Sequence, residues 1–488
     1  MLFNSLAFAL FLPVVVTTWA LAPERGRRWV LLVASYVFYC TWKPEYGLLM
    51  AATTTLDWFV GMRIEDAPTV SRKRAWLTVT LCSNLGVLFL FKYWNLLNGS
   101  AAAVATATGL GWPVPMLDLV LPVGISFYTF QAMSTAIDVY RGKLKAIRSL
   151  WTFALFVSFF PQLVAGPIER ATTLVPQLLR LPGFDLDRLG RGLRLAAWGL
   201  FKKVVVADRL RLLVDHVYED PTAYSGFAIV IATVFFSWQV YCDFSGYSDI
   251  AVGVARIFGV ELMNNFDHPY GSRSMTEMWT RWHVSLTTWF RDYLYHPLGG
   301  NRVSQPRWVF NVMVVFVLSG LWHGAEWRFA LWGALNGVAL LLDRWTKPLR
   351  DRASAVTGLA SVPWLHTAVA VGGTQLLWWI TIVPFRARSA TDTWTLYTHV
   401  GQGWEHFGDP VALGLFLNRV DLDPWMFGFC VLLIPIVEIV ETLRRRPAWA
   451  AWLAERATAT RWGLDYALVF AVLVLGHWVD SPFIYFQF

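Results

Sequence analysis

Long apolar runs separated by short polar stretches recur along the chain from Leu2 to Trp478. Judged by length and flanking residues, each predicts a helix that enters or crosses a lipid bilayer. Runs near 29–62, 150–166 and 192–260 are candidates for tilted, re-entrant or broken segments, which a membrane protein tolerates only inside a protein-walled cavity. The predicted segments are 2–22, 29–41, 44–62, 75–97, 117–140, 150–166, 192–208, 225–241, 246–260, 308–323, 327–343, 364–386, 425–443 and 463–480.

Basic residues cluster in short loops between these segments, at 25–28, 72–74, 141–148, 344–352 and 444–446. Such clusters mark the cytoplasmic side of a membrane protein. The loop 98–115 carries no charge and the stretch 388–424 is mildly acidic, so both are placed outside. No positive charge precedes the first apolar run, which therefore does not resemble a secretory signal.

The composition agrees with a membrane protein. Of the 488 residues, 56% are hydrophobic and only 15% are charged, against roughly 25% charged in soluble domains. No linker divides the chain, so we expect one membrane domain over 1–488. Cys40, Cys82, Cys242 and Cys430 are scattered and indicate neither disulfides nor a metal site. The net charge of +8 lies mainly in the inner loops and does not indicate nucleic-acid binding.

His323 lies in the otherwise apolar run 315–327. A titratable side chain at membrane depth is costly and usually functional, and imidazole exchanges protons near neutral pH. Gly324 allows another group to approach closely. Glu326, one helical turn away, either orients the ring or lies at the outer boundary. The structural alternative is a histidine that hydrogen-bonds a neighbouring helix.

The segment 275–302 is dense in aromatic and charged residues. This pattern favours a helix that lies at the inner interface or lines the mouth of a pocket, followed by a turn at 297–302 that contains Asn301. An amphipathic helix with snorkelling arginines, in which His283 is only structural, is the alternative. The side chains concerned are Trp279, Arg281, Trp282, His283, Trp289, Arg291 and Asp292.

Other polar residues stand in apolar surroundings. For most of them we favour a structural role in hydrogen bonding between helices. Lys202 and Lys203 either snorkel to an interface or contact an anionic donor. The remaining candidates are Gln131 and Asp138 in one segment, and Asp243, Ser245, Tyr247 and Asp249 in a glycine-containing stretch that is a candidate for a break.

Long motifs give a more specific indication. The stretches 279–302 and 321–333 resemble the membrane-bound O-acyltransferase family, most of all the branch with the alginate O-acetyltransferase membrane subunit and the D-alanyl transfer protein of teichoic acid. Further similar stretches are 121–131, 160–168, 241–251 and the closing 482–488. The resemblance covers nearly the whole chain.

The resemblance implies an all-α polytopic membrane protein, with a ring of tilted helices around a central tunnel. An acyl thioester enters from inside and the acceptor from outside. His323 is then the catalytic residue, and His283 matches a second polar position that is often Asn in the family. Candidates for the tunnel wall are Trp282, Arg281, Trp322, Gln131, Asp243, Asp292 and Asn301.

The chemistry expected from this resemblance is O-acetylation. His323 Nε2 would act as general base, which contributes about 10²–10⁴ in rate, and His283, Arg281 or a tunnel amide would polarise the carbonyl. Trp282 and Trp322 would exclude water. A transient acyl-histidine is equally compatible with the sequence.

The donor is expected to be acetyl-CoA, used as a substrate, with no bound cofactor and no metal. The acceptor is an exported polysaccharide such as alginate, acetylated directly or through a periplasmic acetyltransferase partner that docks on the outer loop or on 482–488. The expected location is a bacterial inner membrane.

Two alternatives remain at this point. The first is the same chemistry with teichoic acid, peptidoglycan, cellulose or a lipid as acceptor. The second is a proton-coupled transporter in which buried His and Asp relay protons. Transporters often show paired halves with matching broken helices, and the sequence shows no such symmetry.

Overall fold

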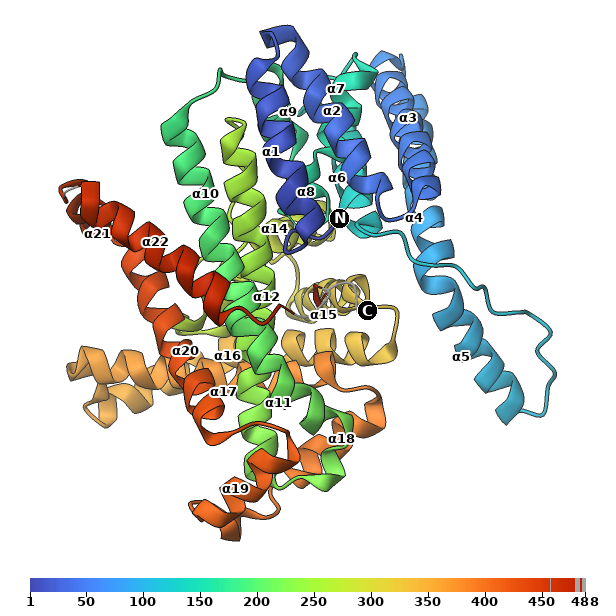
Figure 1. The fold of residues 1–488 in the computed structure, drawn as a ribbon. Helices are drawn as coiled ribbons and strands as arrows, with labels where there is room; N and C mark the ends of the chain where they lie inside the picture. Colours follow the sequence, from blue (N-terminus) through green and yellow to red (C-terminus); the bar gives the residue numbers. More distant parts are fainter. Residues whose placement is uncertain (165, 457, 479–482, 485–488) are drawn as a thin grey trace. The chain divides into compact units, whose positions relative to one another are not determined.

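The computed structural model describes residues 1–164, 166–456, 458–478 and 483–484 (Figure 1). These residues form helices and no β-strand, which confirms the all-α prediction. They group into two compact units, one from 1–196 with 248–264 and the other from 197–247 with 265 onward. Whether the two units act as the single expected domain stays a prediction.

The first unit begins with paired helices in which α1 packs on α2, α2 on α7, and α3 on both α4 and α6. Helix α4 continues through a π-helical turn, η1, into α5. The elements are α1 (Leu6–Leu21), α2 (Glu24–Cys40), α3 (Pro44–Asp66), α4 (Val70–Leu88), η1 (Phe89–Tyr93), α5 (Trp94–Ala107), α6 (Ile125–Tyr140), α7 (Leu150–Ser158), α8 (Phe160–Leu163), α9 (Ala171–Leu179) and α10 (Leu186–Leu200), whose last turn belongs to the second unit.

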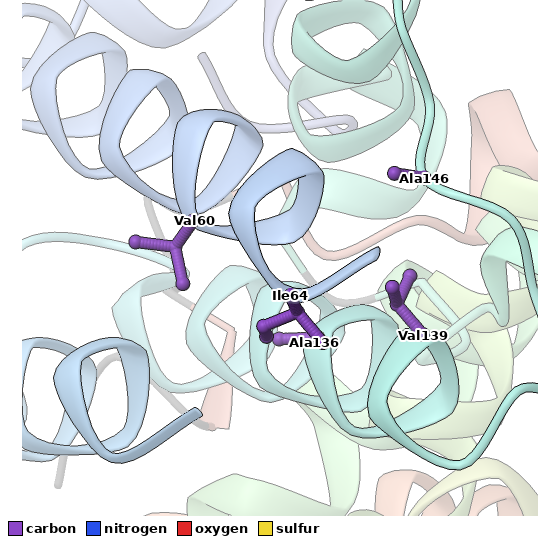
Figure 2. Close-up of a cluster of buried hydrophobic side chains, with 5 residues drawn as sticks. All are labelled: Val60, Ile64, Ala136, Val139 and Ala146. Carbon is purple, nitrogen blue, oxygen red and sulfur yellow. The ribbon is translucent and has the colours of Figure 1, made fainter. Parts of the chain in front are cut away.

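A small apolar core joins α3 to α6. Figure 2 shows Val60 and Ile64 of α3 together with Ala136 and Val139 of α6 and Ala146 of the following loop. The spacing of Val60 and Ile64 places both on one face of their helix. This cluster and its partly buried neighbours fix the two helices side by side within the first unit.

The second unit contains the long helix α12 and the helical hairpin α15–α16, which packs on α17. Its elements are η2 (Phe201–Ala207), α11 (Asp208–Glu219), η3 (Pro221–Ala223), α12 (Gly226–Ile257), which ends in the first unit, η4 (Pro269–Gly271), α13 (Met275–Arg281), α14 (Val284–Phe290), η5 (Arg291–Tyr295), α15 (Gln305–His323), α16 (Trp327–Val356), η6 (Leu359–Ser361), α17 (Pro363–Arg386), α18 (Ala390–His399), η7 (Trp404–His406), α19 (Pro410–Arg419), α20 (Pro424–Arg444), α21 (Pro447–Ala454) and α22 (Thr458–Leu475).

Five helical segments are long and apolar enough to cross a membrane: 70–107, α12, α17, α20 and α22. Apolar helix α1 is shorter. The helices agree with the multi-pass expectation, although many predicted boundaries shift by several residues.

Two predicted boundaries were wrong. Segments 225–241 and 246–260 are one helix, α12, of 32 residues with no break at the glycine-containing stretch. A Cβ at Gly246 would lie 2.6 Å from the Gly199 carbonyl oxygen, so glycine here lets α12 approach α10 closely. The segment predicted at 117–140 becomes helical only at Ile125, after an extended stretch.

Candidate functional site

His323 is the last residue of α15, and small residues at the α15–α16 contact fix its position. A Cβ at Gly320 would lie 2.1 Å from the Phe329 carbonyl oxygen, and one at Gly333 would lie 2.2 Å from the Phe316 carbonyl oxygen. Both distances are far below van der Waals contact. The two helices therefore touch backbone to backbone, a packing that only glycine permits.

The turn after His323 is equally constrained. A Cβ at Gly324 would lie 2.0 Å from the ring of Phe329, which is fully buried. Arg328 then ties the start of α16 to the end of α17, because its Nη1 donates to the carbonyls of Phe385 at 3.0 Å and Ala387 at 2.8 Å. These contacts hold the histidine-bearing end of the hairpin in one place.

His283 stands at a sharp bend between α13 and α14. Its backbone is left-handed, with φ at 43°, and it is one of only a few such non-glycine residues among those described. The helix expected over this stretch is therefore divided into two, α13 and α14, with His283 between them. A non-glycine residue in this region is strained by about 1–3 kcal/mol and tends to occur at functional sites.

Asn265 stabilises the bend from outside the two helices. Its carbonyl oxygen accepts the Val284 N–H at 2.9 Å, and its Oδ1 accepts the Ser285 N–H at 3.4 Å. These bonds satisfy donors in the first turn of α14 that would otherwise lack acceptors. On the other side of the bend, Asp267 N–H donates to the carbonyl of Arg281 at 3.0 Å, so both flanks of His283 are fixed.

The two histidine rings face a common region, with centroids 6.1 Å apart. Both are buried, at 1% exposure for His283 and 4% for His323. Two hydrogen bonds of about 3 Å to one shared atom span a similar distance, so both rings can contact the same reacting group. Burial lowers the pKa of His283 to about 3, which keeps this imidazole neutral.

Aromatic rings surround the histidines. Trp322 lies 5.0 Å and Trp332 5.1 Å from the His323 centroid, and Phe385 lies 5.5 Å away. The ring of Phe244 contacts His283 edge to face at 4.6 Å. These rings make a dry environment in which polar groups interact strongly.

A cavity of about 280 Å³ reaches both histidines. One face of α15 lines it, from Trp308 through Val312, Phe316 and Ser319 to His323. Fifteen residues of helix separate its ends, which corresponds to about 22 Å at 1.5 Å per residue. The cavity is therefore long and narrow, with the histidines at one end.

The opposite end of the cavity is basic. Arg291 and Arg344 both line it and are exposed, and the guanidinium of Arg344 lies 4.8 Å from the ring of Trp308. The indole of Trp308 donates to the Tyr295 hydroxyl at 3.1 Å. This mouth presents two cations beside aromatic rings, an arrangement suited to a phosphate-bearing ligand.

The predicted residues near the histidines have different surroundings. Trp322 contacts both rings, and Trp282 packs 4.7 Å from Trp378. Arg281 forms an ion pair with Glu277, and Asp292 pairs with Arg291 at 2.9 Å. Asn301 is an exposed loop residue. Of the residues predicted as catalytic or as tunnel wall, His283 and His323 line the cavity, as do Trp279 and Arg291 of the predicted aromatic and charged segment.

Two other carboxylates have clear structural partners. Asp243 lies 2.6 Å from the Nζ of Lys203, which also bonds Asp208 at 2.8 Å, and all three are almost fully buried. The second Asp243 oxygen accepts the Ile484 N–H at 2.8 Å. Glu326 forms an ion pair with Arg328 at 2.8 Å, and whether it orients His323 stays a prediction.

The remaining predicted residues are on elements other than those that carry the two histidines. Gln131 is buried on α6 of the first unit, where its carbonyl accepts the hydroxyls of Ser134 and Thr135. Lys202 bonds Glu441 at 3.1 Å instead of snorkelling. In the closing stretch 482–488, only Phe483 and Ile484 are described, so the proposed partner contact at that tail lies largely outside the described residues.

The sequence interpretation missed several cavity residues. Thr276, Thr280 and Thr287 supply hydroxyl groups to the wall, and Ser319 lies one turn before His323. Helical spacing of three and four residues connects these positions to the histidines. The spacing could have indicated these residues from the sequence. Within 276–287, however, the bend at His283 interrupts the helical periodicity and makes the pattern hard to recognise.

The apolar helices indicate a multi-pass membrane protein, and its cavity reaches two buried imidazoles. Two imidazoles that line one cavity can exchange protons with a ligand bound there. The two histidines beside the cavity are compatible with the transfer of a group from a ligand bound there.

Comparison with known proteins agrees. Residues 143–373 match the model of MBOAT, the membrane-bound O-acyltransferase family. The chain is 36% identical to the probable alginate O-acetylase of Azotobacter vinelandii, over 100% of both chains. It is 39% identical to that of Pseudomonas aeruginosa, over 81% of this chain and 74% of that protein. It is also 34% identical to the peptidoglycan O-acetyltransferase of Helicobacter pylori, over 70% of each chain.

The chain therefore belongs to the membrane-bound O-acyltransferase family. It is a membrane O-acyltransferase, which confirms the resemblance and the enzyme class expected from the sequence. This membership favours acyl transfer over the transporter alternative.

Proposed function

We propose that this enzyme transfers an acetyl group from acetyl-CoA on the cytoplasmic side to a hydroxyl of an exported polysaccharide, directly or through a periplasmic acetyltransferase. The observation that carries the proposal is one cavity with exposed arginines at one end and two buried histidines at the other. A thioester that enters thiol end first would bring its carbonyl to the histidines.

In the proposed step, His323 Nε2 removes the proton from the acceptor hydroxyl. The oxygen attacks the thioester carbonyl carbon, the carbon–sulfur bond breaks, and the proton passes from His323 to the departing thiolate. His283 is neutral because it is buried, so it can donate one N–H to the carbonyl oxygen while charge develops there.

The cavity wall supports a nucleotide-linked donor. Trp308, Val312, Phe316 and other apolar side chains suit a long flexible arm, while the threonine hydroxyls offer hydrogen bonds to its amides. Arg291 and Arg344 are placed to contact phosphates at the mouth. In the sequence prediction, these basic residues belong to the cytoplasmic side, where acetyl-CoA is present.

The relatives' names support the choice of acceptor. Two of those reported above are named as probable alginate O-acetylases, and one is named as a peptidoglycan O-acetyltransferase. We assign an exported polysaccharide of the alginate kind because the alginate relative covers the whole chain. The expected location is a bacterial inner membrane.

The test is transfer from labelled acetyl-CoA by purified protein in nanodiscs, with alginate or peptidoglycan and with any co-encoded periplasmic partner. We expect His323→Ala to lower transfer by about 10²–10⁴. His366→Ala is the matched control, because His366 is exposed on α17. Transfer by the His323 variant at the wild-type rate contradicts the proposed centre.

The donor is tested separately with acetyl-CoA and S-acetyl-pantetheine, which lacks the nucleotide. We expect Arg344→Gln to raise the KM for acetyl-CoA and to leave that for the shorter thioester unchanged. Arg302→Gln removes an exposed arginine outside the cavity and is the control. An equal effect on both thioesters would contradict phosphate recognition at the mouth.

A further inference from the structure

The first unit has a small cavity of its own, the α2–α7 cavity, where the first turns of α2 and α7 pack on each other. Its volume is about 100 Å³, and three buried leucines line it: Leu32, Leu155 and Leu178. One water molecule takes up roughly 30 Å³, whereas a pocket that encloses a whole small-molecule ligand measures roughly 300–1,000 Å³. The α2–α7 cavity therefore fits one group of a larger molecule.

Arg28 gives this cavity a positive charge. It is half-buried, and among the residues that the structure describes it makes no ion pair or side-chain hydrogen bond. The neighbouring Arg27 differs, because its Nη1 donates to the Pro182 carbonyl at 3.1 Å and its guanidinium lies 5.4 Å from the ring centroid of Trp19. A half-buried cation without a counter-charge favours an anionic ligand.

Two hydroxyl groups line the cavity beside Arg28. They belong to Ser149 and Thr152, at the start of α7. Each hydroxyl can donate one hydrogen bond. The Thr152 N–H already donates to Ser149 Oγ at 3.3 Å, so this end of α7 is capped and the positive charge of the cavity comes from Arg28. One guanidinium and two hydroxyls suit a group with several acceptor oxygens, such as a phosphate.

Two exposed tryptophans complete the lining. Trp29 is 49% exposed and Trp151 is 57% exposed, and their ring centroids lie 5.4 Å apart. Exposed tryptophans of membrane proteins concentrate at the level of the lipid headgroups. Arg28 ends the basic cluster 25–28, and Ser149 directly follows the cluster 141–148. In the sequence prediction both clusters belong to the cytoplasmic side.

We propose that the α2–α7 cavity binds the phosphate group of an anionic phospholipid from the inner leaflet. Arg28 pairs with the phosphate, the hydroxyls of Ser149 and Thr152 donate to its oxygens, and the glycerol backbone lies against the two tryptophans. The small volume agrees with this ligand, because only the phosphate enters while the acyl chains stay in the bilayer. The exposed indoles favour an amphiphile over a soluble anion.

This site is separate from the proposed acyl-transfer centre, since the two cavities share no lining residue. The proposal therefore goes beyond the proposed function and does not depend on it. Lipid binding can be measured without any acyl donor or acceptor, so failure of one proposal leaves the other standing.

The experiment measures lipid binding to the full-length protein in detergent by native mass spectrometry. Phosphatidylglycerol is titrated, and phosphatidylcholine with the same acyl chains is the comparison. We expect Arg28→Gln to raise the Kd of the tightest phosphatidylglycerol at least about fivefold, which is the contribution of one basic residue at an anionic membrane surface. Arg25→Gln removes an exposed arginine of the same helix that does not line the cavity, and its Kd should stay within about twofold of wild type.

A second variant covers the case in which Arg28→Gln folds poorly, as judged by thermal unfolding without lipid. Thr152→Val keeps the shape of the side chain and removes one donor, and it should raise the same Kd about threefold. An unchanged Kd in Thr152→Val, or an equal loss in Arg25→Gln and Arg28→Gln, rejects the site. Equal affinity for phosphatidylcholine rejects the preference for an anionic lipid. Displacement of phosphatidylglycerol by millimolar inorganic phosphate would identify a soluble anion as the ligand and overturn the lipid assignment.

Discussion

The contact of α15 with α16 should be the most sensitive packing site for activity. In Gly333→Ala, the new Cβ would lie 2.2 Å from the Phe316 carbonyl oxygen and 2.9 Å from its carbonyl carbon. Ordinary contact begins near 3.4 Å, so the two helices must separate locally by more than about 1 Å, because neither neighbour is a flexible side chain.

The expected magnitudes follow from that displacement. Overpacking of a close interface costs about 1–3 kcal/mol of stability. His323 is on the displaced helix, and misplacing a catalytic group by about 1 Å can lower the rate about 10²-fold. The loss should appear in kcat, because the donor mouth at Arg344 keeps its own side chains.

Gly373→Ala is the matched control. A Cβ at Gly373 of α17 would meet nothing within 4 Å, so alanine should be neutral or stabilise by up to about 1 kcal/mol. Both variants are compared by thermal unfolding of the purified protein and by acetyl transfer. If Gly333→Ala has the same unfolding temperature and the same rate of acetyl transfer as Gly373→Ala, the close helix contact does not position His323.

Three further predictions concern the wider structure. Lys203→Met removes the cation that pairs with two buried carboxylates, Asp208 and Asp243, and should destabilise by about 3–5 kcal/mol. The loss should exceed that of Lys202→Met, as measured by thermal unfolding. Burial raises the pKa of Glu169 to about 7, so the folded state holds this proton more tightly than the unfolded state. The free energy of unfolding of the wild type should therefore decrease between about pH 5 and pH 7. The free energy of unfolding of Glu169→Gln, relative to wild type, should accordingly increase by about 3 kcal/mol by pH 8. A constant difference across pH would contradict this. At the bend, His283→Asn should keep the fold and part of the activity, whereas His283→Gln should lose about 1 kcal/mol of stability; equal unfolding temperatures would oppose the strained-bend interpretation.

The sequence located the apolar helices and His323 because both signals are local. A titratable residue in an apolar run needs no knowledge of the rest of the fold. Gly246 shows where a prediction from neighbouring residues alone fails. Glycine in an apolar run suggested a break in the helix, but its neighbour is the backbone of Gly199, which is distant in the chain.

The cavity was harder to predict because its two ends come from separate segments. Arg291 follows α14 in the segment 275–302, whereas Arg344 is on α16 and looks in the sequence like an ordinary residue of a basic loop. Only the fold places both on one cavity, where Arg344 lies over the ring of Trp308. In the same way, Asp243 looked like a tunnel residue, whereas the structure gives it Lys203 and the Ile484 N–H as partners.

The bend at position 283 restricts which residue types could fill the proposed role. In the proposed step the residue must be polar to contact the reacting carbonyl, and its backbone is left-handed with φ at 43°. Among residues other than glycine, Asn, Asp and His adopt that conformation most readily. Asp would bring a negative charge to a buried place where charge is costly. His and Asn therefore meet both requirements, and this is the basis for expecting His283→Asn to keep the fold and part of the activity where His283→Gln loses stability.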